Sequence, residues 1–159
     1  MTDAEFTQLA DKYKDRIYRL CYTYLRSASD CDDAVQETLI KLYLSGKSFK
    51  DDEHIRNWLF RVAVNECRHM LRSRGRTIPL EEAAELAAPP EETKRRVYEA
   101  VRSLEPGYRV IVHLYYYENM QTKNIAALLK LNAATVRTRL KRAREQLKTQ
   151  LNGVDLNDI

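Results

Sequence analysis

Apolar residues recur every three or four positions along most of the chain, which is the spacing of one face of an α-helix. Only four glycines and four prolines occur, and this composition suits a mostly helical protein. The pattern predicts an all-α fold. The expected helices span residues 4–26, 31–44, 55–72, 92–104, 108–117, 121–129 and 132–148.

A change in composition divides this pattern into two parts. Residues 74–93 form an acidic, alanine-rich stretch that contains Pro79, Pro89 and Pro90 and has weak apolar periodicity. Proline pairs end helices and stiffen connections. The sequence therefore predicts two small helical domains joined by a flexible linker. Their expected bounds are residues 1–73, 74–93 for the linker, and 94–152.

The two expected domains differ in net charge. The net charge of the chain is +4, yet residues 1–73 carry 12 basic and 12 acidic side chains, whereas residues 94–150 carry 13 basic and four acidic ones. This asymmetry indicates that the C-terminal domain meets a polyanion and that the N-terminal domain meets something else.

The basic charge is concentrated on the last expected helix, at residues 132–148. Its apolar stripe consists of Val136, Leu140, Ala143 and Leu147, and cations surround that stripe. A basic helix face alone is equally typical of ordinary solvated surface. Here a short helix at residues 121–129 and a three-residue turn precede it, which is the helix-turn-helix arrangement. In that arrangement the second helix enters the major groove of DNA.

Two helices of the N-terminal domain carry further candidate surfaces. The helix at residues 31–44 presents acids, an amide and one apolar side chain on its outer face: Asp33, Gln36, Glu37 and Ile40. This mixture suits a protein partner, although a solvated face with one exposed isoleucine is the plainer interpretation.

The helix at residues 55–72 has an expected apolar stripe that includes Trp58, Leu59, Val62 and Ala63, so Trp58 is predicted to lie in the core. The opposite side carries polar and basic residues with two apolar neighbours: Arg56, Asn57, Phe60, Arg61, Val64, Asn65, Arg68 and Arg72. Cations with planar groups suit a single nucleic-acid strand. Solvated helix surface is the competing interpretation.

Other chemistry finds little support in the sequence. Cys21, Cys31 and Cys67 lie on or beside apolar stripes, so we expect buried, reduced thiols. The three histidines share no ligand spacing with them, and we expect neither a metal nor a cofactor. Motifs for phosphate-binding loops or paired nucleophiles and bases are missing. We expect a non-enzymatic, cytoplasmic protein without a signal peptide or membrane insertion.

Taken in order, these parts resemble the bacterial sigma factors of the extracytoplasmic-function group, which contain the second and fourth conserved sigma regions joined by a linker. Four stretches carry the resemblance: DDAVQET at residues 32–38, IRNWLFRVAVN at 55–65, LEPGYR at 104–109 and TVRTRLKRAR at 135–144. The resemblance implies a protein that binds core RNA polymerase and directs promoter-specific transcription initiation.

The resemblance also implies partners and residue roles in the first domain. The face of Asp33, Gln36, Glu37 and Ile40 would dock on the β′ clamp helices of polymerase. The loop at residues 45–54 and the following helix would melt and read the −10 element as single strand. Asn65 is the first candidate for an extruded base, and the implied −10 contacts are Phe49, Asn57, Phe60, Arg61, Asn65 and Arg68.

For the second domain, the resemblance implies reading of the −35 element in the major groove. Candidates for base edges are Arg137, Thr138, Lys141 and Arg142, and candidates for phosphates are Thr135, Arg139 and Arg144. Contact with the polymerase β flap and control by an anti-sigma factor acting in trans are further implications.

The sequence departs from the family pattern near the helix-turn-helix turn. Lys130 stands where family members often have glycine, so either this lysine has a positive φ or the turn differs. Asn124 replaces a common acid, and the entry at residues 132–134 is atypical. Two rival hypotheses stay open. One is a helix-turn-helix regulator whose N-terminal half senses a signal or dimerises, and the other is a polymerase-binding adaptor without independent promoter-opening activity.

Overall fold

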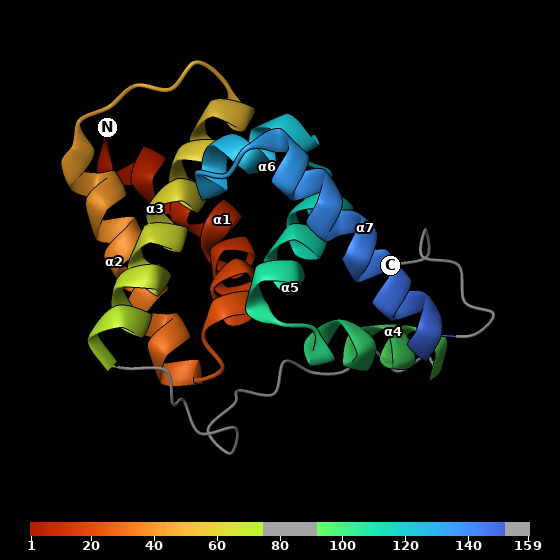
Figure 1. Ribbon diagram of the computed structural model, residues 1–159. Helices are drawn as coiled ribbons and strands as arrows, with labels where there is room; N and C mark the ends of the chain where they lie inside the picture. Colours follow the sequence, from red (N-terminus) through yellow and green to blue (C-terminus); the bar gives the residue numbers. More distant parts are fainter. Residues whose placement is uncertain (75–91, 152–159) are drawn as a thin grey trace. The chain divides into compact units, whose positions relative to one another are not determined.

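The computed structural model describes residues 1–74 and 92–151, and these two ranges form seven α-helices and one π-helix (Figure 1). The all-α class expected from the apolar periodicity is therefore confirmed. The chain divides into two compact units, Met1–Ala84 and Glu85–Ile159. The predicted linker falls largely on residues 75–91, which lie outside the described ranges.

The first unit consists of α1 (Asp3–Tyr24), α2 (Ala28–Ser45) and α3 (Asp52–Arg74), each packed against the other two. The start of α2 is three residues earlier than predicted because Ser27 is its N-cap and accepts a hydrogen bond from the Asp30 amide. At the other end, Gly46 adopts a left-handed conformation with φ of 62° and ends the helix, a position that favours glycine.

The core of the first unit contains all three cysteines, which are buried and unpaired as expected. A hydrogen bond with Cys67, together with burial, raises the pKa of the Cys21 thiol well above its ordinary value. Burial likewise raises the pKa of the Cys31 thiol. Because the thiolate is the reactive form, these side chains behave as small core residues.

The buried face of α3 is rotated from the one predicted. Leu59, Ala63 and Cys67 of the predicted stripe are fully buried. Phe60 and Val64 are also fully buried, whereas Trp58 and Val62 are only half-buried. Apolar residues surround much of this helix, so spacing alone allowed two choices for the core face. Contacts with α1 decide between them, since the guanidinium of Arg16 lies 5.8 Å from the centre of the Phe60 ring.

The second unit contains the following elements in chain order: α4 (Glu92–Ser103), α5 (Pro106–Val112), the π-helix η2 (His113–Tyr117), α6 (Thr122–Leu129) and α7 (Ala133–Gln150). The predicted helix at residues 108–117 is thus α-helical only in its first part. In η2 a backbone hydrogen bond spans five residues and not four: the Glu118 amide donates to the His113 carbonyl at 3.1 Å. Apolar residues of α4, α5 and α7, together with the residues that directly follow α4 and α7, form a shared core: Val97, Ala100, Leu104, Val112, Ala143, Leu147 and Leu151.

A buried arginine joins α4 to α5. Arg109 is only 5% exposed, and its Nη1 donates to the carbonyl oxygens of Arg102 at 3.0 Å and Leu104 at 3.2 Å. These carbonyls lie where Pro106 interrupts the helical ladder, because proline has no amide hydrogen to donate. The side chain therefore supplies hydrogen bonds that the backbone cannot make.

The turn between α6 and α7 shows which of the two alternatives for Lys130, a positive φ or a different turn, is correct. This residue is left-handed, with φ of 58° and ψ of 44°, and its amide donates to the Ala126 carbonyl. Asn132 then caps α7, because its side chain accepts from the Thr135 amide at 2.8 Å. A lysine thus has the positive φ that the predicted turn required. Among the described helices, none combines the length and apolar composition needed to cross a membrane.

Candidate nucleic-acid interface

Helix α7 separates its apolar and basic sides cleanly. The four residues of its predicted stripe are buried, with exposed fractions of at most 3%. The four side chains predicted to meet base edges are all exposed: Arg137, Thr138, Lys141 and Arg142. Because the stripe fixes the rotation of the helix on its unit, these side chains point away from the core as one set.

The three predicted phosphate contacts are less accessible, since Thr135, Arg139 and Arg144 are half-buried. Arg139 extends over the start of α5, where its Nη1 lies 3.6 Å from the position that a β-carbon on Gly107 would occupy. Thr135 donates its backbone amide to the cap of its own helix. On α7, the predicted base contacts are therefore exposed, whereas the predicted phosphate contacts are partly covered by the protein.

Arg144 is bound within the fold. Its Nε donates to the Tyr116 hydroxyl at 2.5 Å, and its guanidinium lies 5.3 Å from the centre of the Tyr115 ring and 5.5 Å from that of Tyr116. The two rings meet edge to face. This arginine therefore ties α7 to η2. This role was not predicted from the sequence, although three consecutive tyrosines in the same domain as a basic helix are a signal for such cation–π contacts.

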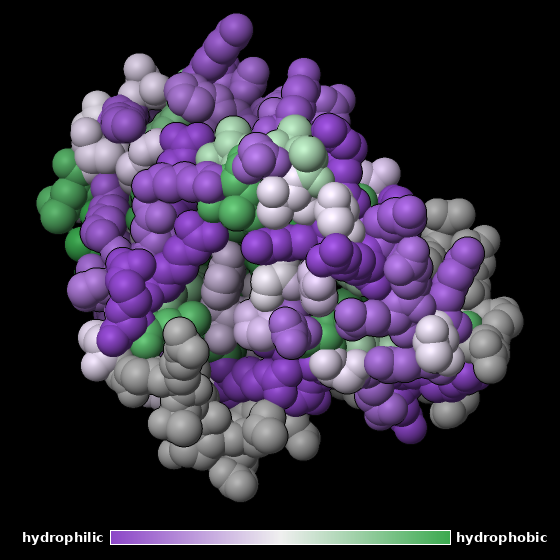
Figure 2. Space-filling model, in the orientation of Figure 1, coloured by the Kyte–Doolittle hydropathy of each residue, from purple (hydrophilic) through white to green (hydrophobic). Residues whose placement is uncertain are grey.

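In the first unit, the structure brings the predicted docking residues onto one exposed face of α2. Asp33, Gln36, Glu37 and Ile40 are all exposed, and Ile40 is 43% exposed. Hydrophobic side chains reach the surface at the left edge of Figure 2, over the end of α2. Two large exposed residues of this part of the helix are Tyr43 and Leu44, at 50% and 74% exposure. These two residues were not predicted as part of the docking face, although they follow Ile40 by three and four positions.

The residues predicted to contact the −10 strand do not form one equivalent set. Arg61 and Asn65 are exposed, whereas Asn57 and Arg68 are half-buried. Asn57 also accepts a hydrogen bond from Nη2 of Arg56 at 3.4 Å. Phe60 has an exposed fraction of 0%, so the expectation that its ring is available to stack on a base does not agree with this structure.

Phe49 belongs to an aromatic cluster beside this surface. Its ring meets the rings of His54 and Trp58 edge to face, with centroids 5.3 and 5.6 Å away. The ammonium group of Lys47 lies 5.5 Å from the centre of the Trp58 ring. Trp58 is therefore a half-buried support for the loop at residues 46–51, where the sequence analysis had expected a core residue.

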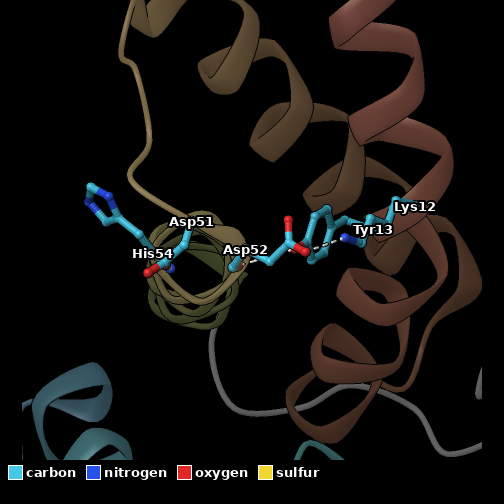
Figure 3. A network of polar contacts seen from close by, with 5 residues as sticks. All are labelled: Lys12, Tyr13, Asp51, Asp52 and His54. Carbon is cyan, nitrogen blue, oxygen red and sulfur yellow. Dashed lines mark hydrogen bonds and ion pairs between the residues drawn. The ribbon is translucent and has the colours of Figure 1, made fainter.

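Polar contacts hold the start of α3 against α1 (Figure 3). The Lys12 ammonium lies 3.0 Å from Oδ2 of Asp52, and the Tyr13 hydroxyl donates to the Asp52 carbonyl at 3.2 Å. The hydrogen bond to Asp52 raises the pKa of Lys12. The carboxylate of Asp51 accepts the His54 amide at 2.8 Å and so caps the first turn of α3. The end of the loop is thus fixed to two helices.

Comparison with protein families gives two matches that fall on the two units. Sigma-70 region 2 matches residues 9–77, and Sigma-70 region 4 matches residues 94–147. The first match contains the exposed face of α2 and the surface of α3. The second contains the helix-turn-helix of α6 and α7. Together they account for most of the chain in the order that the sequence analysis expected.

Curated relatives match over nearly the whole chain. The ECF RNA polymerase sigma factor SigW of Bacillus subtilis is 28% identical over 92% of this chain and 88% of its own length. The ECF RNA polymerase sigma-E factor of Haemophilus influenzae is also 28% identical, over 92% of this chain and 87% of its own length.

Solved structures share the fold. The sigma factor RpoE of Bartonella quintana, in complex with the anti-sigma factor NepR, has a TM-score of 0.78 at 21% identity, covering 95% of this chain and 99% of its own. CnrH, in complex with the cytosolic domain of CnrY, has a TM-score of 0.66 at 25% identity, covering 97% of this chain and 92% of its own.

Proposed function

Because the chain belongs to the sigma-70 family and is of the extracytoplasmic-function type, we propose that it binds core RNA polymerase and directs promoter-specific initiation of transcription. The observation that carries this proposal is the presence of regions 2 and 4, in that order, at residues 9–77 and 94–147. The likeness to curated sigma factors over 92% of the chain supports it.

We assign the two functions of such a factor to the two parts of the chain. Residues 1–73 bind polymerase and the −10 element, residues 94–152 bind the −35 element, and residues 74–93 connect them. The exposed face formed by Asp33, Gln36, Glu37 and Ile40 supports docking on the polymerase clamp. A partly apolar centre with polar surroundings is a common composition of protein interfaces.

The DNA contacts follow from exposure and charge. On α7, Arg137, Thr138, Lys141 and Arg142 are exposed and suit the major groove. On α3, Arg61 and Asn65 are exposed beside the loop at residues 46–51 and suit a phosphate and an unpaired base. Binding of unpaired bases offsets the cost of opening the duplex. Polymerase supplies the chemistry of RNA synthesis, so the proposed role is non-enzymatic.

The partners follow from the same reasoning. Promoter DNA and the polymerase β′ clamp meet the surfaces just described, and we place contact with the β flap on the second domain. Because the solved RpoE relative is complexed with an anti-sigma factor, we also propose control by such a protein. The site of action is the cytoplasm, where polymerase and promoter DNA occur together.

In vitro transcription tests the proposed function. The purified chain, core polymerase and a library of genomic fragments are combined, and the 5′ ends of the transcripts are mapped. We expect initiation at a small set of fragments only when the chain is present. Initiation that does not depend on the chain would contradict the proposal. Tight, polymerase-independent binding to a palindromic duplex would favour the rival regulator.

A paired substitution tests the docking face. Changing Gln36 and Glu37 together to alanine removes two exposed polar contacts, and we expect binding to core polymerase to weaken about 100-fold. Glu145 and Gln146 are a matched control, because they are the same pair of residue types, both exposed, on α7. Fluorescence anisotropy of the labelled chain measures both variants. Equal affinities would show that the docking face lies elsewhere.

A further inference from the structure

The loop at residues 46–51 has its most specific contacts with one side chain, His54. The Lys50 amide donates to Nδ1 of His54 at 3.1 Å, while the His54 amide donates to the Asp51 carboxylate at 2.8 Å. The two bonds run in opposite directions between the loop and the first turn of α3. They resemble a capping box in which the histidine replaces the usual glutamate.

The direction of the Lys50 bond fixes the chemical state of the imidazole. A nitrogen that accepts an amide hydrogen has no hydrogen of its own, so the ring that makes this bond is neutral and protonated only at Nε2. The same ring lies against Phe49, which in turn lies against Trp58. One side chain thus supplies both a hydrogen bond and an aromatic support to two consecutive loop residues.

We propose that His54 is a positioning residue that holds the loop at residues 46–51 in the shape that meets the unpaired −10 strand. Its consequence at a promoter rests on the proposed function, whereas its effect on the loop does not. The acceptor at Nδ1 holds the Lys50 amide, and the ring lies against Phe49. A side chain at this position that has a ring but no acceptor therefore leaves the Lys50 amide without its partner.

Charged groups surround His54 on several sides. Asp51 binds its backbone amide, and Lys47 lies over Trp58 at the far side of the aromatic cluster. On the side of α1, the ion pair of Lys12 and Asp52 is directed away from the imidazole (Figure 3). The contacts of Asp52 with Lys12 and Tyr13 hold α3 against α1 without His54, so loss of the Lys50 bond acts on the loop and leaves the helix packing intact.

Two substitutions separate the acceptor from the ring. His54→Asn places an amide oxygen close to the position of Nδ1 and has no ring. His54→Phe keeps a ring beside Phe49 but has no acceptor. His69→Asn is the matched control, because His69 is an exposed histidine of the same helix.

The first measurement uses the free full-length chain. The Lys50 amide is followed by NMR, and the chain's single tryptophan, Trp58, by fluorescence. We expect a shifted Lys50 amide for His54→Phe, a Lys50 amide close to that of the wild type for His54→Asn, and wild-type signals for the His69→Asn control. A Lys50 amide that is unchanged in His54→Phe would overturn the proposal.

The second measurement uses holoenzyme assembled with core polymerase on a promoter fragment recovered by the transcription assay. Promoter opening is read by permanganate reactivity of unpaired thymines. We expect opening to fall about fivefold for His54→Phe, which is the size of one neutral hydrogen bond, and to stay close to the wild-type level for His54→Asn. Unchanged opening in His54→Phe, with its loop shifted, would overturn the positioning role while leaving the sigma-factor function standing. Promoter-independent polymerase activity with every variant would instead refute that function.

Discussion

Helices α3 and α7 both carry residues that the proposed function assigns to DNA, but they divide their surfaces differently. On α7 a narrow stripe is buried and the central cations are exposed. On α3 the apolar residues extend around much of the helix, two candidate contacts are half-buried, and Phe60 is in the core. Because the apolar and basic sides of α7 are separate, its exposed basic surface consists of residues of this helix alone. Helix α3 instead shares its surface with the loop that precedes it.

The two surfaces therefore depend on different contacts within the protein. The exposed set on α7 is fixed by packing of the stripe below it, so its arrangement follows from the helix alone. The surface beside α3 also depends on Phe49, Trp58 and the polar contacts of Asp51 and Asp52. We expect substitutions on α7 to affect stability or DNA binding separately, and substitutions around α3 to couple the two.

The largest expected effect concerns Phe60. Its replacement by alanine leaves a cavity between α1 and α3, and we expect the free energy of unfolding to fall by about 3–5 kcal/mol. Replacement of its exposed neighbour Arg61 by alanine should change this free energy by only about 0.5 kcal/mol. Urea denaturation followed by circular dichroism measures both. A stable Phe60→Ala variant that fails only in promoter opening would restore the stacking role that burial argues against.

Two arginines on α7 test whether the half-buried one stabilises the fold and the exposed one contacts DNA. Arg144→Gln loses its contacts with Tyr115 and Tyr116, so we expect the free energy of unfolding to fall by about 1–2 kcal/mol. Arg142→Gln should leave stability unchanged and reduce the slope of log affinity against log salt by about 0.9, as expected for one lost phosphate contact.

Denaturation and titration of a duplex DNA probe at several salt concentrations provide the two readouts for these arginines. Arg144→Gln could instead reduce the slope of log affinity against log salt and leave the free energy of unfolding unchanged. Arg144 would then contact DNA like the exposed cations, and the proposed difference between Arg144 and Arg142 would be wrong.

The smallest expected effect concerns the turn before α7. Glycine tolerates a positive φ without the steric cost that a side chain has there, so Lys130→Gly should raise the free energy of unfolding by about 1 kcal/mol. The same change at Lys141, in the middle of α7, should lower it by about 1 kcal/mol. Thermal unfolding of the two variants gives opposite shifts. Shifts of the same sign would contradict the left-handed conformation of Lys130.

The sequence was informative where one pattern dominated. The stripe and cations of α7, the Gly46 cap and the helix-turn-helix order could all be predicted, because each depends on local spacing or on one residue type. The exact core face of α3 could not, since periodicity left open which residues flank Leu59 and Ala63 in the core, and packing against α1, which lies far away in sequence, buries Phe60. The role of Arg144 depends equally on a tertiary contact with η2.

The π-helix was also beyond local prediction, because a single wide turn leaves no repeat in the sequence. It has a consequence for the permissible length of the chain. A π turn contains about one residue more than an α turn, so deletion of one residue between His113 and Tyr117 would let this stretch close as ordinary helix. The residues beyond the deletion would then keep nearly their present orientation relative to α5, because one turn is completed in either case. The same deletion within the α-helical part of α5 would instead rotate the residues beyond it by about 100°. Between α5 and α6, η2 is therefore the place where the loss of one residue least disturbs the alignment of the helix-turn-helix.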